Sequence, residues 1–252
     1  MRADKALVAQ GLARSRACAV DLIRSGKVRL EGRTVTRPSD LVAEHQQLIL
    51  TEQETEPLVS RAGEKLAGAL LDSKTTIPAQ ARVLDAGAGT GGFCQVLLRQ
   101  TGPVRRLYAI DVGHGQLVPE LRRDPRVAVR EGVNLRDLSL DHLEGEAVDL
   151  VVADVSFISM TLLLAPLLSV LRPDGTALLL VKPQFEVGRR RLGKGGVVRS
   201  EADRQAAVAA VVEAAARLGW GSDWQADSRL PGRDGNHEVF VRLRRSGAVD
   251  RI

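Results

Sequence analysis

Cysteine and aromatic residues are scarce in this chain of 252 residues, which holds two cysteines and only 3% Phe, Trp and Tyr. Two cysteines cannot build a disulfide framework, and neither they nor the four scattered histidines have the spacing of metal ligands. We therefore expect no metal site. With so few rings, Leu, Val and Ala must form the core, and stacking on bases should not dominate any binding surface.

Long apolar runs are also missing from the sequence. No run approaches the roughly 18 residues that a membrane-spanning helix needs. The first ten residues, MRADKALVAQ, lack the apolar core of a signal peptide. We therefore expect a cytoplasmic protein without a membrane partner.

The chain does have an ordinary globular composition and a basic charge. It is 44% hydrophobic and 27% charged, and it is long enough for one large α/β domain and a small one. Its net charge of +5 favours an acidic partner. The first fifty residues contain nine Lys and Arg against five Asp and Glu, a balance of +4, so one fifth of the chain carries most of this charge.

The stretch from Ala81 to Phe93, ARVLDAGAGTGGF, has the pattern of a nucleotide-binding turn. Residues 82–84 end a short buried strand, glycines allow a tight turn, and residues 93–100 return to helical spacing. The predicted cofactor contacts in this stretch are Asp85, Gly87, Ala88, Gly89, Thr90, Gly91, Gly92 and Phe93. Because the glycines also satisfy G-x-G-x-x-G, the turn alone leaves a nicotinamide and an adenosyl cofactor open.

Strand-like and helix-like segments alternate from residue 60 onward. Strands are predicted at residues 83–86, 107–112, 127–131, 150–154, 177–182 and 238–243, and helices at 60–71, 93–100, 117–121, 162–171 and 201–218. The pattern predicts an α/β, Rossmann-like fold with a mostly parallel sheet, covered on both faces, and an antiparallel edge strand at 237–242. We divide the chain into a small domain at 1–51, a linker at 52–59 and a large domain at 60–252.

Polar residues follow several of the predicted strands. Asp111 ends the second strand, where an acid can bind ribose hydroxyls, and Asn134 follows the third, near a possible adenine edge. The fourth and fifth strands end at Asp154 and Lys182. Charged residues at two successive strand ends indicate a site of reaction that faces the bound nucleotide. A simple ion pair between the two residues is the alternative.

The first fifty residues read as two short helices followed by short strands, a small α+β domain. Their basic residues cluster on the helix-turn-helix edge, which is typical of nucleic-acid binding; a merely solvated basic surface is the alternative. The predicted RNA contacts are Arg2, Lys5, Arg14, Arg16, Lys27 and Arg29. The order R-x-D-x-x-L, G-L-A-R-S-R and I-x-S-G-K-V-x-L-E-G resembles the RNA-binding domain named after ribosomal protein S-four. That resemblance implies binding to structured RNA by shape and phosphate contact.

Four further motifs are D-A-G-x-x-T-G-G-F, A-x-D-V-G-x-G-Q-L, D-L-V-V-A-D-V-S-F-I-S and L-V-K-P-Q-F-E-V-G. They are similar to the FtsJ-like methyltransferase family, and more narrowly to its TlyA group, long labelled hemolysins. The resemblance implies methyl transfer from S-adenosylmethionine to a ribose 2′-hydroxyl of ribosomal RNA, typically at cytidine. It also implies a catalytic tetrad, which falls on Lys65, Asp154, Lys182 and Glu238.

The chemistry of such a transfer explains why lysines are needed. The sulfonium methyl is already activated, so the enzyme must align the attacking oxygen and help to remove its proton. Burial and a second nearby ammonium both favour the neutral form of a lysine. We therefore expect Lys182 to accept the 2′-hydroxyl proton, Lys65 to position the ribose, and the two acids to orient the lysines.

A basic, glycine-rich segment directly follows Lys182. Residues 186–199, EVGRRRLGKGGVVR, hold five basic residues against one acid. We interpret them as a mobile loop that grips RNA over the site, with a plain solvated loop as the alternative. The predicted contacts are Arg189, Arg190, Arg191 and Lys194.

Three other functions remain as alternatives. A nicotinamide oxidoreductase could use the same turn but would not need Lys182, Glu238 or an RNA-binding domain. A non-enzymatic ribosome-assembly factor could keep the fold, although the intact tetrad argues against it. The hemolysin label implies membrane lysis, which neither a secretion signal nor a cationic amphipathic helix supports. As partners of a monomeric protein we expect ribosomal RNA or ribosomal subunits.

Overall fold

The computed structural model describes residues 1–13, 15–24, 26–43, 46–50, 58–99, 104–188, 191–232 and 234–245. Its contacts divide the chain into two units, Met1–Pro57 and Leu58–Ile252, and each unit has a hydrophobic core of its own. Of the predicted linker, residues 52–57 lie outside the described residues. The remaining two, Leu58 and Val59, pack against a core of the second unit.

The first unit is a small α+β domain. Its elements are α1 (Ala3–Ala9), α2 (Arg16–Arg24), β1 (Val28–Leu30), β2 (Arg33–Thr34) and β3 (Leu48–Leu50). The strands form an antiparallel sheet in the order β2-β1-β3, and the apolar faces of both helices share one core with it. Ser15 caps α2, because its Oγ accepts a hydrogen bond from the backbone N–H of Cys18 at 3.2 Å.

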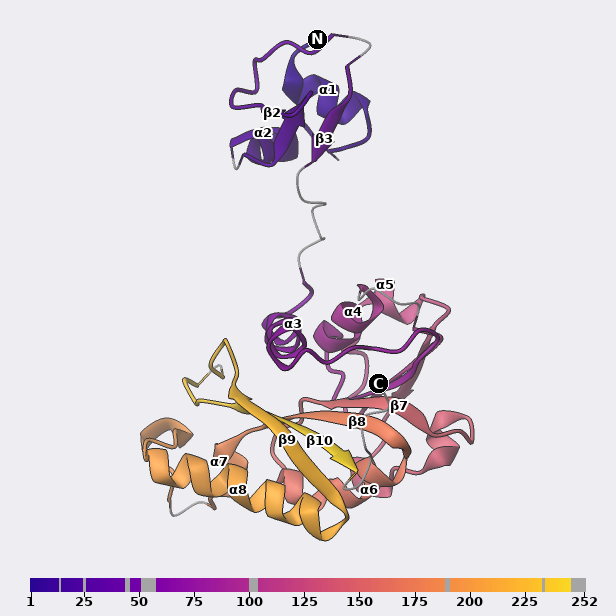
Figure 1. The fold of residues 1–252 in the computed structure, drawn as a ribbon, viewed down its shortest axis with the longest axis vertical. Helices are drawn as coiled ribbons and strands as arrows, with labels where there is room; N and C mark the ends of the chain where they lie inside the picture. The colour runs from indigo at the N-terminus through magenta and orange to yellow at the C-terminus, as the bar shows by residue number, and fades with distance from the viewer. Residues whose placement is uncertain are drawn as a thin grey trace. The chain divides into compact units, whose positions relative to one another are not determined.

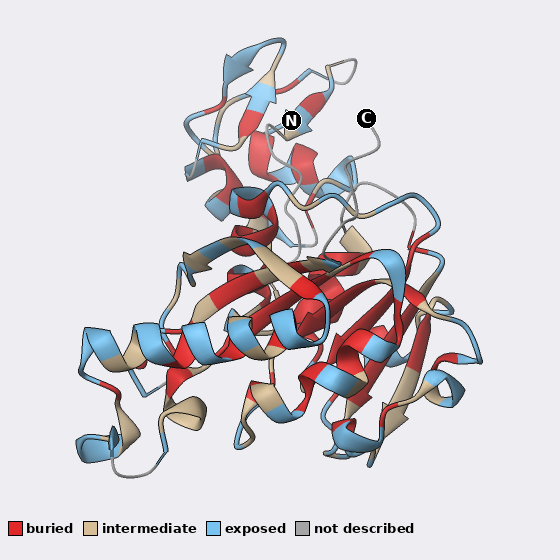
Figure 2. Ribbon diagram, turned by 60° about the horizontal axis from the view of Figure 1, so that its bottom comes forward, coloured by how far each residue is buried: buried red, intermediate tan, exposed pale blue. Residues whose placement is uncertain are grey.

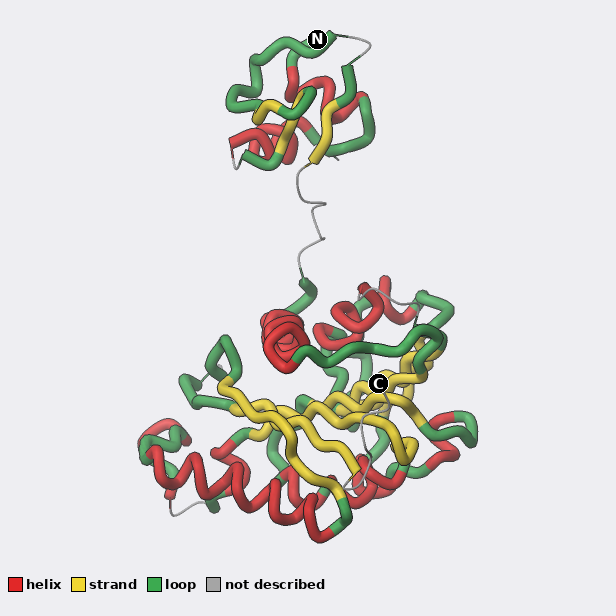
Figure 3. The backbone as a smooth tube through the Cα atoms, viewed as in Figure 1, coloured by secondary structure: helices red, strands yellow, loops and turns green. Residues whose placement is uncertain are grey.

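The second unit is built on one large sheet. Its strands are β4 (Arg82–Ala86), β5 (Arg106–Asp111), β6 (Val127–Glu131), β7 (Val148–Ala153), β8 (Leu171–Val181), β9 (Trp220–Asp227) and β10 (Val239–Arg245). They lie in the order β6-β5-β4-β7-β8-β10-β9. Figures 1 and 3 show the sheet with helices on either side of it. β4 to β8 are parallel, whereas β10 is antiparallel to both of its neighbours. The predicted mostly parallel, Rossmann-like sheet is confirmed.

Helices cover both faces of this sheet. They are α3 (Arg61–Ser73), α4 (Gly92–Arg99), α5 (Pro119–Arg122), α6 (Leu164–Ser169), α7 (Pro183–Glu186) and α8 (Glu201–Arg217), with single turns η1 (Leu135–Asp137), η2 (Leu140–Leu143), η3 (Met160–Leu162) and η5 (Lys194–Gly196). Apolar residues of α3, α4 and α5 join one core, and those of α6 and α8 join the other. Figure 2 shows the buried strands between helices with exposed outer faces. Because side chains alternate along a strand, one sheet supplies both cores.

The antiparallel end of the sheet differs from the prediction in one respect. The sequence predicts a single edge strand at residues 237–242, but β10 lies inside the sheet and β9 forms its edge. The sequence of β9, WGSDWQAD, contains a glycine and two aspartates and lacks β-branched residues, so its composition does not indicate a strand. Pairing with β10 along its whole length overrides that weak propensity.

Candidate active site

Three strand ends meet at one edge of the sheet and carry three of the predicted catalytic residues. Asp154 directly follows β7, Lys182 directly follows β8, and Glu238 directly precedes β10. β8 pairs with β7 in parallel and with β10 in antiparallel orientation, so the ends of β7 and β8 and the start of β10 are neighbours. Leu180 and Phe240 lie in the core beneath α3. Side chains two positions apart along a strand lie on the same face, so Lys182, two residues after Leu180, and Glu238, two residues before Phe240, point toward the α3 face of the sheet.

The fourth predicted residue, Lys65, reaches this edge from α3. Its Nζ lies 2.6 Å from Oε2 of Glu238, and only 8% of Lys65 and 3% of Glu238 is exposed. The loop before β10 closes tightly over the pair, because a Cβ at Gly232 would lie 2.9 Å from Oε1 of Glu238. Removing one partner would leave a buried charge uncompensated, which is strongly unfavourable. This pair is therefore a fixed part of the site wall.

Lys182 forms a second ion pair, with Asp154. Its Nζ lies 2.6 Å from Oδ1 of Asp154 and donates a hydrogen bond to Oγ of Ser156 at 2.8 Å. The two lysine side chains are about equally exposed, but Asp154 is 16% exposed against 3% for Glu238, so this pair has the more accessible carboxylate. The sequence hypothesis gives the two acids the role of orienting the two lysines. In the structure Asp154 pairs with Lys182 and Glu238 pairs with Lys65, an arrangement compatible with that role.

The glycine turn after β4 lies directly against the end of β7. Gly87 has a φ of 85°, and a Cβ at this position would lie 2.5 Å from the carbonyl oxygen of Asp154. Glycine adopts this positive φ readily and has no Cβ to collide with that oxygen, so this position requires glycine. The N–H of Gly87 donates to the carbonyl of Ile110 in β5 at 2.8 Å. The turn is thus held between the strand that carries Asp154 and the strand that ends at Asp111.

Asp111 joins two turns of the backbone. Its Oδ2 accepts a hydrogen bond from the N–H of Gly89 at 2.8 Å, and its Oδ1 accepts one from the N–H of Gly113 at 2.7 Å. Each carboxylate oxygen has a further lone pair available. The predicted role of Asp111, accepting hydrogen bonds from ribose hydroxyls, is compatible with this geometry.

Asp85 is a carboxyl group buried at the base of the turn. It is fully buried, its Oδ2 accepts a hydrogen bond from Sγ of Cys94 at 3.0 Å, and among the described residues its Oδ1 has no partner. Burial raises the pKa of Asp85 to about 7, and the nearby carboxylates of Asp154 and Asp111 act in the same direction. An unpartnered buried oxygen fits a cationic ligand group, such as the amino group of a methionine moiety.

The remaining predicted cofactor contacts differ in how open they are. Thr90 is exposed and Gly89 is half-buried, whereas Ala88, Gly91 and Gly92 are buried. The ring of Phe93 is 2% exposed and stacks against Phe240 with centroids 6.2 Å apart. Phe93 is therefore a core residue, and its predicted contact with a cofactor is restricted to its backbone.

Asn134 lies after β6, as predicted. Its side chain is exposed, and its Oδ1 accepts a hydrogen bond from the N–H of Arg136 at 3.1 Å, which caps η1. The side-chain amide keeps a donor group for a ligand. The residue is thus both a structural cap and a candidate contact for an adenine edge.

In the first unit, two of the predicted RNA-binding arginines share one buried acid. Nε of Arg2 lies 3.0 Å from Oδ1 of Asp4, and Nη2 of Arg16 lies 2.9 Å from its Oδ2. These hydrogen bonds lower the pKa of Asp4 to about 2. Both arginine side chains remain about half exposed, so each guanidinium has free donors for a phosphate.

The other predicted contacts of this unit are less constrained. Lys5 and Arg29 are exposed and Lys27 is half-buried. Nη1 of Arg29 donates to the carbonyl of Gly32 at 3.3 Å, in the turn between β1 and β2. Arg14 lies outside the described residues.

The basic segment after α7 is anchored at its carboxyl end. Arg189 and Arg190 lie outside the described residues, Arg191 pairs with Asp203 of α8 at 3.2 Å, and Lys194 is exposed. The buried amide of Asn236 accepts from the N–H of Val198 at 2.9 Å and donates to the carbonyl of Gly196 at 3.1 Å. Because Asn236 is two residues before Glu238, these two hydrogen bonds connect the end of the segment to the strand that follows Glu238.

Comparison with known proteins identifies the family. Residues 58–245 match the FtsJ-like methyltransferase family, and residues 1–48 match the S4 domain. The chain belongs to the FtsJ-like methyltransferase family. It is 45% identical to the 16S/23S rRNA (cytidine-2′-O)-methyltransferase TlyA of Mycobacterium tuberculosis, over 96% of this chain and 89% of the relative. That similarity assigns it to the TlyA group of the FtsJ-like family.

Other relatives are named either as rRNA methyltransferases or as hemolysins. The Campylobacter jejuni 23S rRNA (cytidine-2′-O)-methyltransferase TlyA is 35% identical, over 74% of this chain and 70% of that protein. A solved Streptococcus thermophilus structure described as a hemolysin has a TM-score of 0.72 and 33% identity, covering 98% of this chain and 89% of that one. No helix among the described residues is long and apolar enough to cross a membrane.

Several side chains of the site escape prediction from the sequence. Ser156, Cys94 and Asn236 each make a hydrogen bond to or beside a predicted residue, yet none belongs to a charged or glycine-rich pattern. Glu186 stands inside the L-V-K-P-Q-F-E-V-G motif, but nothing in that spacing indicates its partner. The sequence indicates these residues only by their position, because each lies within a few residues of a predicted site residue or of the glycine turn.

Proposed function

We propose that this protein transfers the methyl group of S-adenosylmethionine to the 2′-hydroxyl of a cytidine in ribosomal RNA. The observation that carries the proposal is the convergence of the Lys182–Asp154 and Lys65–Glu238 pairs beside the glycine turn. A nicotinamide oxidoreductase would not need these pairs. TlyA relatives that are named as enzymes act on this substrate class.

The residues of the turn suit the proposed cofactor. Asp85 would pair with its cationic amino group through the free Oδ1, Asp111 would accept hydrogen bonds from its ribose, and Asn134 would contact the adenine edge. The half-buried backbone at Gly87 and Gly89 allows the ligand to approach closely. When bound, the cofactor supplies a methyl group on a positively charged sulfur, which needs no further activation.

The two ion pairs have different roles in the proposed methyl transfer. Lys182 is paired with the more exposed of the two carboxylates, Asp154, and we assign it the role of accepting the 2′-hydroxyl proton. For this step Lys182 must be a neutral amine, which becomes an ammonium when it takes the proton; Asp154 and Ser156 orient Nζ, since both contact it, and Asp154 would stabilise the ammonium that forms. Lys65, held by Glu238, would fix the ribose from the α3 side. Alignment of the attacking oxygen with the methyl group is the main contribution of these residues.

RNA binding is assigned to the first unit and to the basic segment after α7. Arg2 and Arg16 offer two guanidinium groups around one buried acid, and Lys5, Lys27 and Arg29 would add phosphate contacts. Arg189, Arg190, Arg191 and Lys194 would hold the RNA near Lys182. We expect the protein to act as a monomer in the cytoplasm, where its proposed substrate is found.

The direct test is methyl incorporation. Purified protein, labelled S-adenosylmethionine and ribosomal RNA or subunits from a strain lacking this gene should give labelled RNA, and ribose-methylation mapping should locate a cytidine. Methyl transfer to protein, to a base, or to no rRNA fraction would contradict the proposal.

Lys182 provides a test of the mechanism. Lys182→Ala should lower kcat by about 100- to 10,000-fold, the range expected for a lost general base, and leave the Kd for S-adenosylmethionine nearly unchanged. Lys182→Arg keeps the positive charge beside Asp154 but cannot lose its proton at neutral pH, so it should be equally inactive. An active arginine variant, or equal losses of kcat and cofactor affinity, would show that the lysine does not act as the base.

A further inference from the structure

The loops that follow β7 and β8 are joined at several points beyond the Lys182–Asp154 pair. The loop after β7 contains Ser156 and leads into η3 (Met160–Leu162), and α7 (Pro183–Glu186) follows β8 at once. Since Asp154 and Lys182 begin these two loops, any contact that fixes one loop against the other also fixes the distance between the two residues.

Glu186, at the end of α7, makes the most extensive of these contacts. Its Oε2 accepts a hydrogen bond from Oγ of Ser159 at 2.5 Å, and its Oε1 accepts one from the N–H of Met160 at 2.7 Å. Ser159 in turn caps η3 by accepting from the N–H of Thr161 at 3.2 Å. Both oxygens of one carboxylate therefore hold the start of η3.

The connection from Glu186 back to Lys182 is short and regular. Three residues lie between them, and the N–H of Phe185 donates to the carbonyl of Lys182 at 2.9 Å. Burial raises the pKa of Glu186 above its ordinary value, although the hydrogen bonds that it accepts act in the opposite direction. A half-buried carboxylate that keeps two short hydrogen bonds is a rigid link.

An aromatic contact runs parallel to this link. The rings of Phe157 and Phe185 lie 5.4 Å apart, and Phe157 has a φ of 66°. A bulky residue holds this left-handed conformation only where its surroundings enforce it. The loop after β7 therefore carries backbone strain at Phe157, three residues after Asp154, and the hydrogen bonds of Glu186 to Ser159 and Met160 hold the loop just beyond it.

We propose that Glu186 is a positioning residue, which clamps the loop after β7 to α7 and thereby sets Asp154 and Lys182 in their productive arrangement. This inference rests on the proposed function, because it assigns a consequence for methyl transfer. In this role Glu186 acts through Ser159 and Met160 and needs no contact with substrate or cofactor. Residues that orient a catalytic group in this way typically change rates by about 10- to 100-fold.

The test compares Glu186→Ala with Glu186→Gln. Glutamine keeps an oxygen to accept from the N–H of Met160, and its amide can donate to Oγ of Ser159, so it preserves the clamp. We expect Glu186→Ala to lower kcat by about 10- to 100-fold with the Kd for S-adenosylmethionine within about twofold of wild type. Glu186→Gln should restore kcat to within about threefold. Glu213→Ala, an exposed glutamate on α8, is the matched control and should behave as wild type.

A second readout reports on the clamp without catalysis. Hydrogen–deuterium exchange of residues 156–161 should accelerate in Glu186→Ala and not in Glu186→Gln. Wild-type kcat in the alanine variant, failure of glutamine to rescue, or unchanged exchange would each overturn the assignment. If the wild-type protein transfers no methyl group, the proposed function fails, and exchange alone then decides whether Glu186 fixes the loop.

Discussion

At the scale of single residues, Asp85 shows how a folded site can shift the pKa of a carboxyl. Its burial favours the protonated form, and the thiol of Cys94 is its one described partner. An aspartate in an unfolded chain has a pKa of about 3.9. The folded protein therefore holds this proton up to a pH of about 7, whereas the unfolded chain releases it near pH 4.

This difference predicts a pH dependence of stability in the ligand-free protein. The contribution of Asp85 is fully present below a pH of about 4 and is lost as the pH rises to about 7, because the folded state binds more protons in that window. Asp85→Asn should therefore flatten the fall in Tm between pH 5 and pH 7. Both tryptophans, Trp220 and Trp224, lie in the second unit, so their fluorescence reports its unfolding alone. Asp174→Asn, at an exposed site, should keep the wild-type slope; the same slope in Asp85→Asn would refute the assignment.

The residue scale also shows what the sequence can and cannot predict. Asp154 and Lys182 are predictable because each is charged and directly follows an apolar strand, and parallel strand ends must meet. The partner of Lys182 at Ser156 and the clamp at Glu186 depend on loop conformations that no periodicity encodes. Phe93 is predicted as a cofactor contact because it follows the glycines, and the sequence does not show that its side chain is buried in helix α4.

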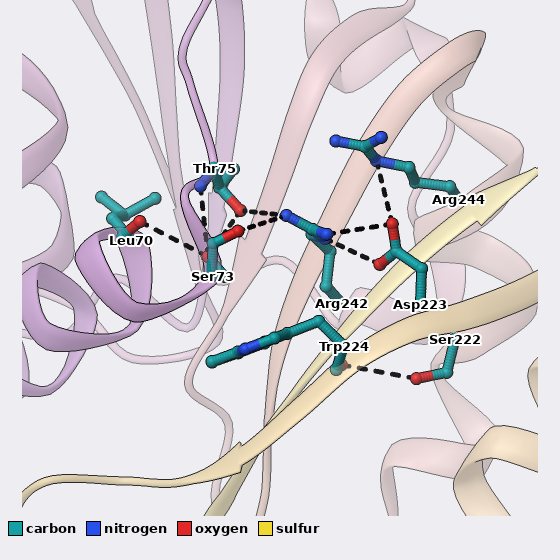
Figure 4. A network of polar contacts seen from close by, with 8 residues as sticks. All are labelled: Leu70, Ser73, Thr75, Ser222, Asp223, Trp224, Arg242 and Arg244. Carbon is teal, nitrogen blue, oxygen red and sulfur yellow. Dashed lines mark hydrogen bonds and ion pairs between the residues drawn. The ribbon is translucent and has the colours of Figure 1, made fainter. Parts of the chain in front are cut away.

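At the scale of elements, α3 is the helix that the site depends on most, because it carries Lys65. Its start lies against α4, where a Cβ at Gly63 would be 2.9 Å from the carbonyl of Gly92. Its end is held by Arg242 of β10, whose Nη1 donates to the carbonyl of Ser73 at 2.6 Å (Figure 4). The same guanidinium pairs with both carboxylate oxygens of Asp223 in β9, at 2.7 and 3.0 Å.

Arg242 should therefore stabilise the second unit by joining α3 to both antiparallel strands. Arg242→Ala would leave the Ser73 carbonyl without this donor, and we expect a loss of about 2–3 kcal/mol in the free energy of unfolding. Arg244 also contacts Asp223, at 3.4 Å, but is more exposed. Arg244→Ala is the matched comparison and should cost about 1 kcal/mol or less. Urea unfolding followed by tryptophan fluorescence measures both, and equal losses would contradict this ranking.

The antiparallel strands also show why an element can be missed. β10 was predicted because its residues alternate between apolar and polar positions, whereas β9 has no such signal. Yet β9 is needed at this end of the sheet, since Asp223 orients Arg242 and thus the end of α3. Tertiary pairing, not local propensity, defines this strand.

At the scale of the whole molecule, the two units carry two separate tasks in the proposed function. Residues 1–50 have a net charge of +4, and residues 58–252, with 27 basic and 23 acidic residues, also have +4. The three glutamates of residues 51–57 account for the difference from the total of +5. Both units thus have a charge that suits RNA, while the residues assigned to methyl transfer lie in the second unit alone.

This separation predicts that RNA affinity and catalysis respond to different substitutions. Changing the exposed Lys5 and Arg29 to Gln removes two of the assigned phosphate contacts and leaves both pairs of the buried Asp4 intact. The slope of log K against log salt for ribosomal RNA should then become shallower by about 2. The Kd for S-adenosylmethionine and kcat at saturating RNA should stay near wild type. Asp4→Asn keeps Arg2 and Arg16 but frees them from their shared anchor, so it should weaken RNA binding with little change in slope. Lys182→Ala should show the reverse pattern, a loss of kcat with an unchanged salt slope. A matching fall of kcat in the variant of Lys5 and Arg29 would show that the two units do not act separately.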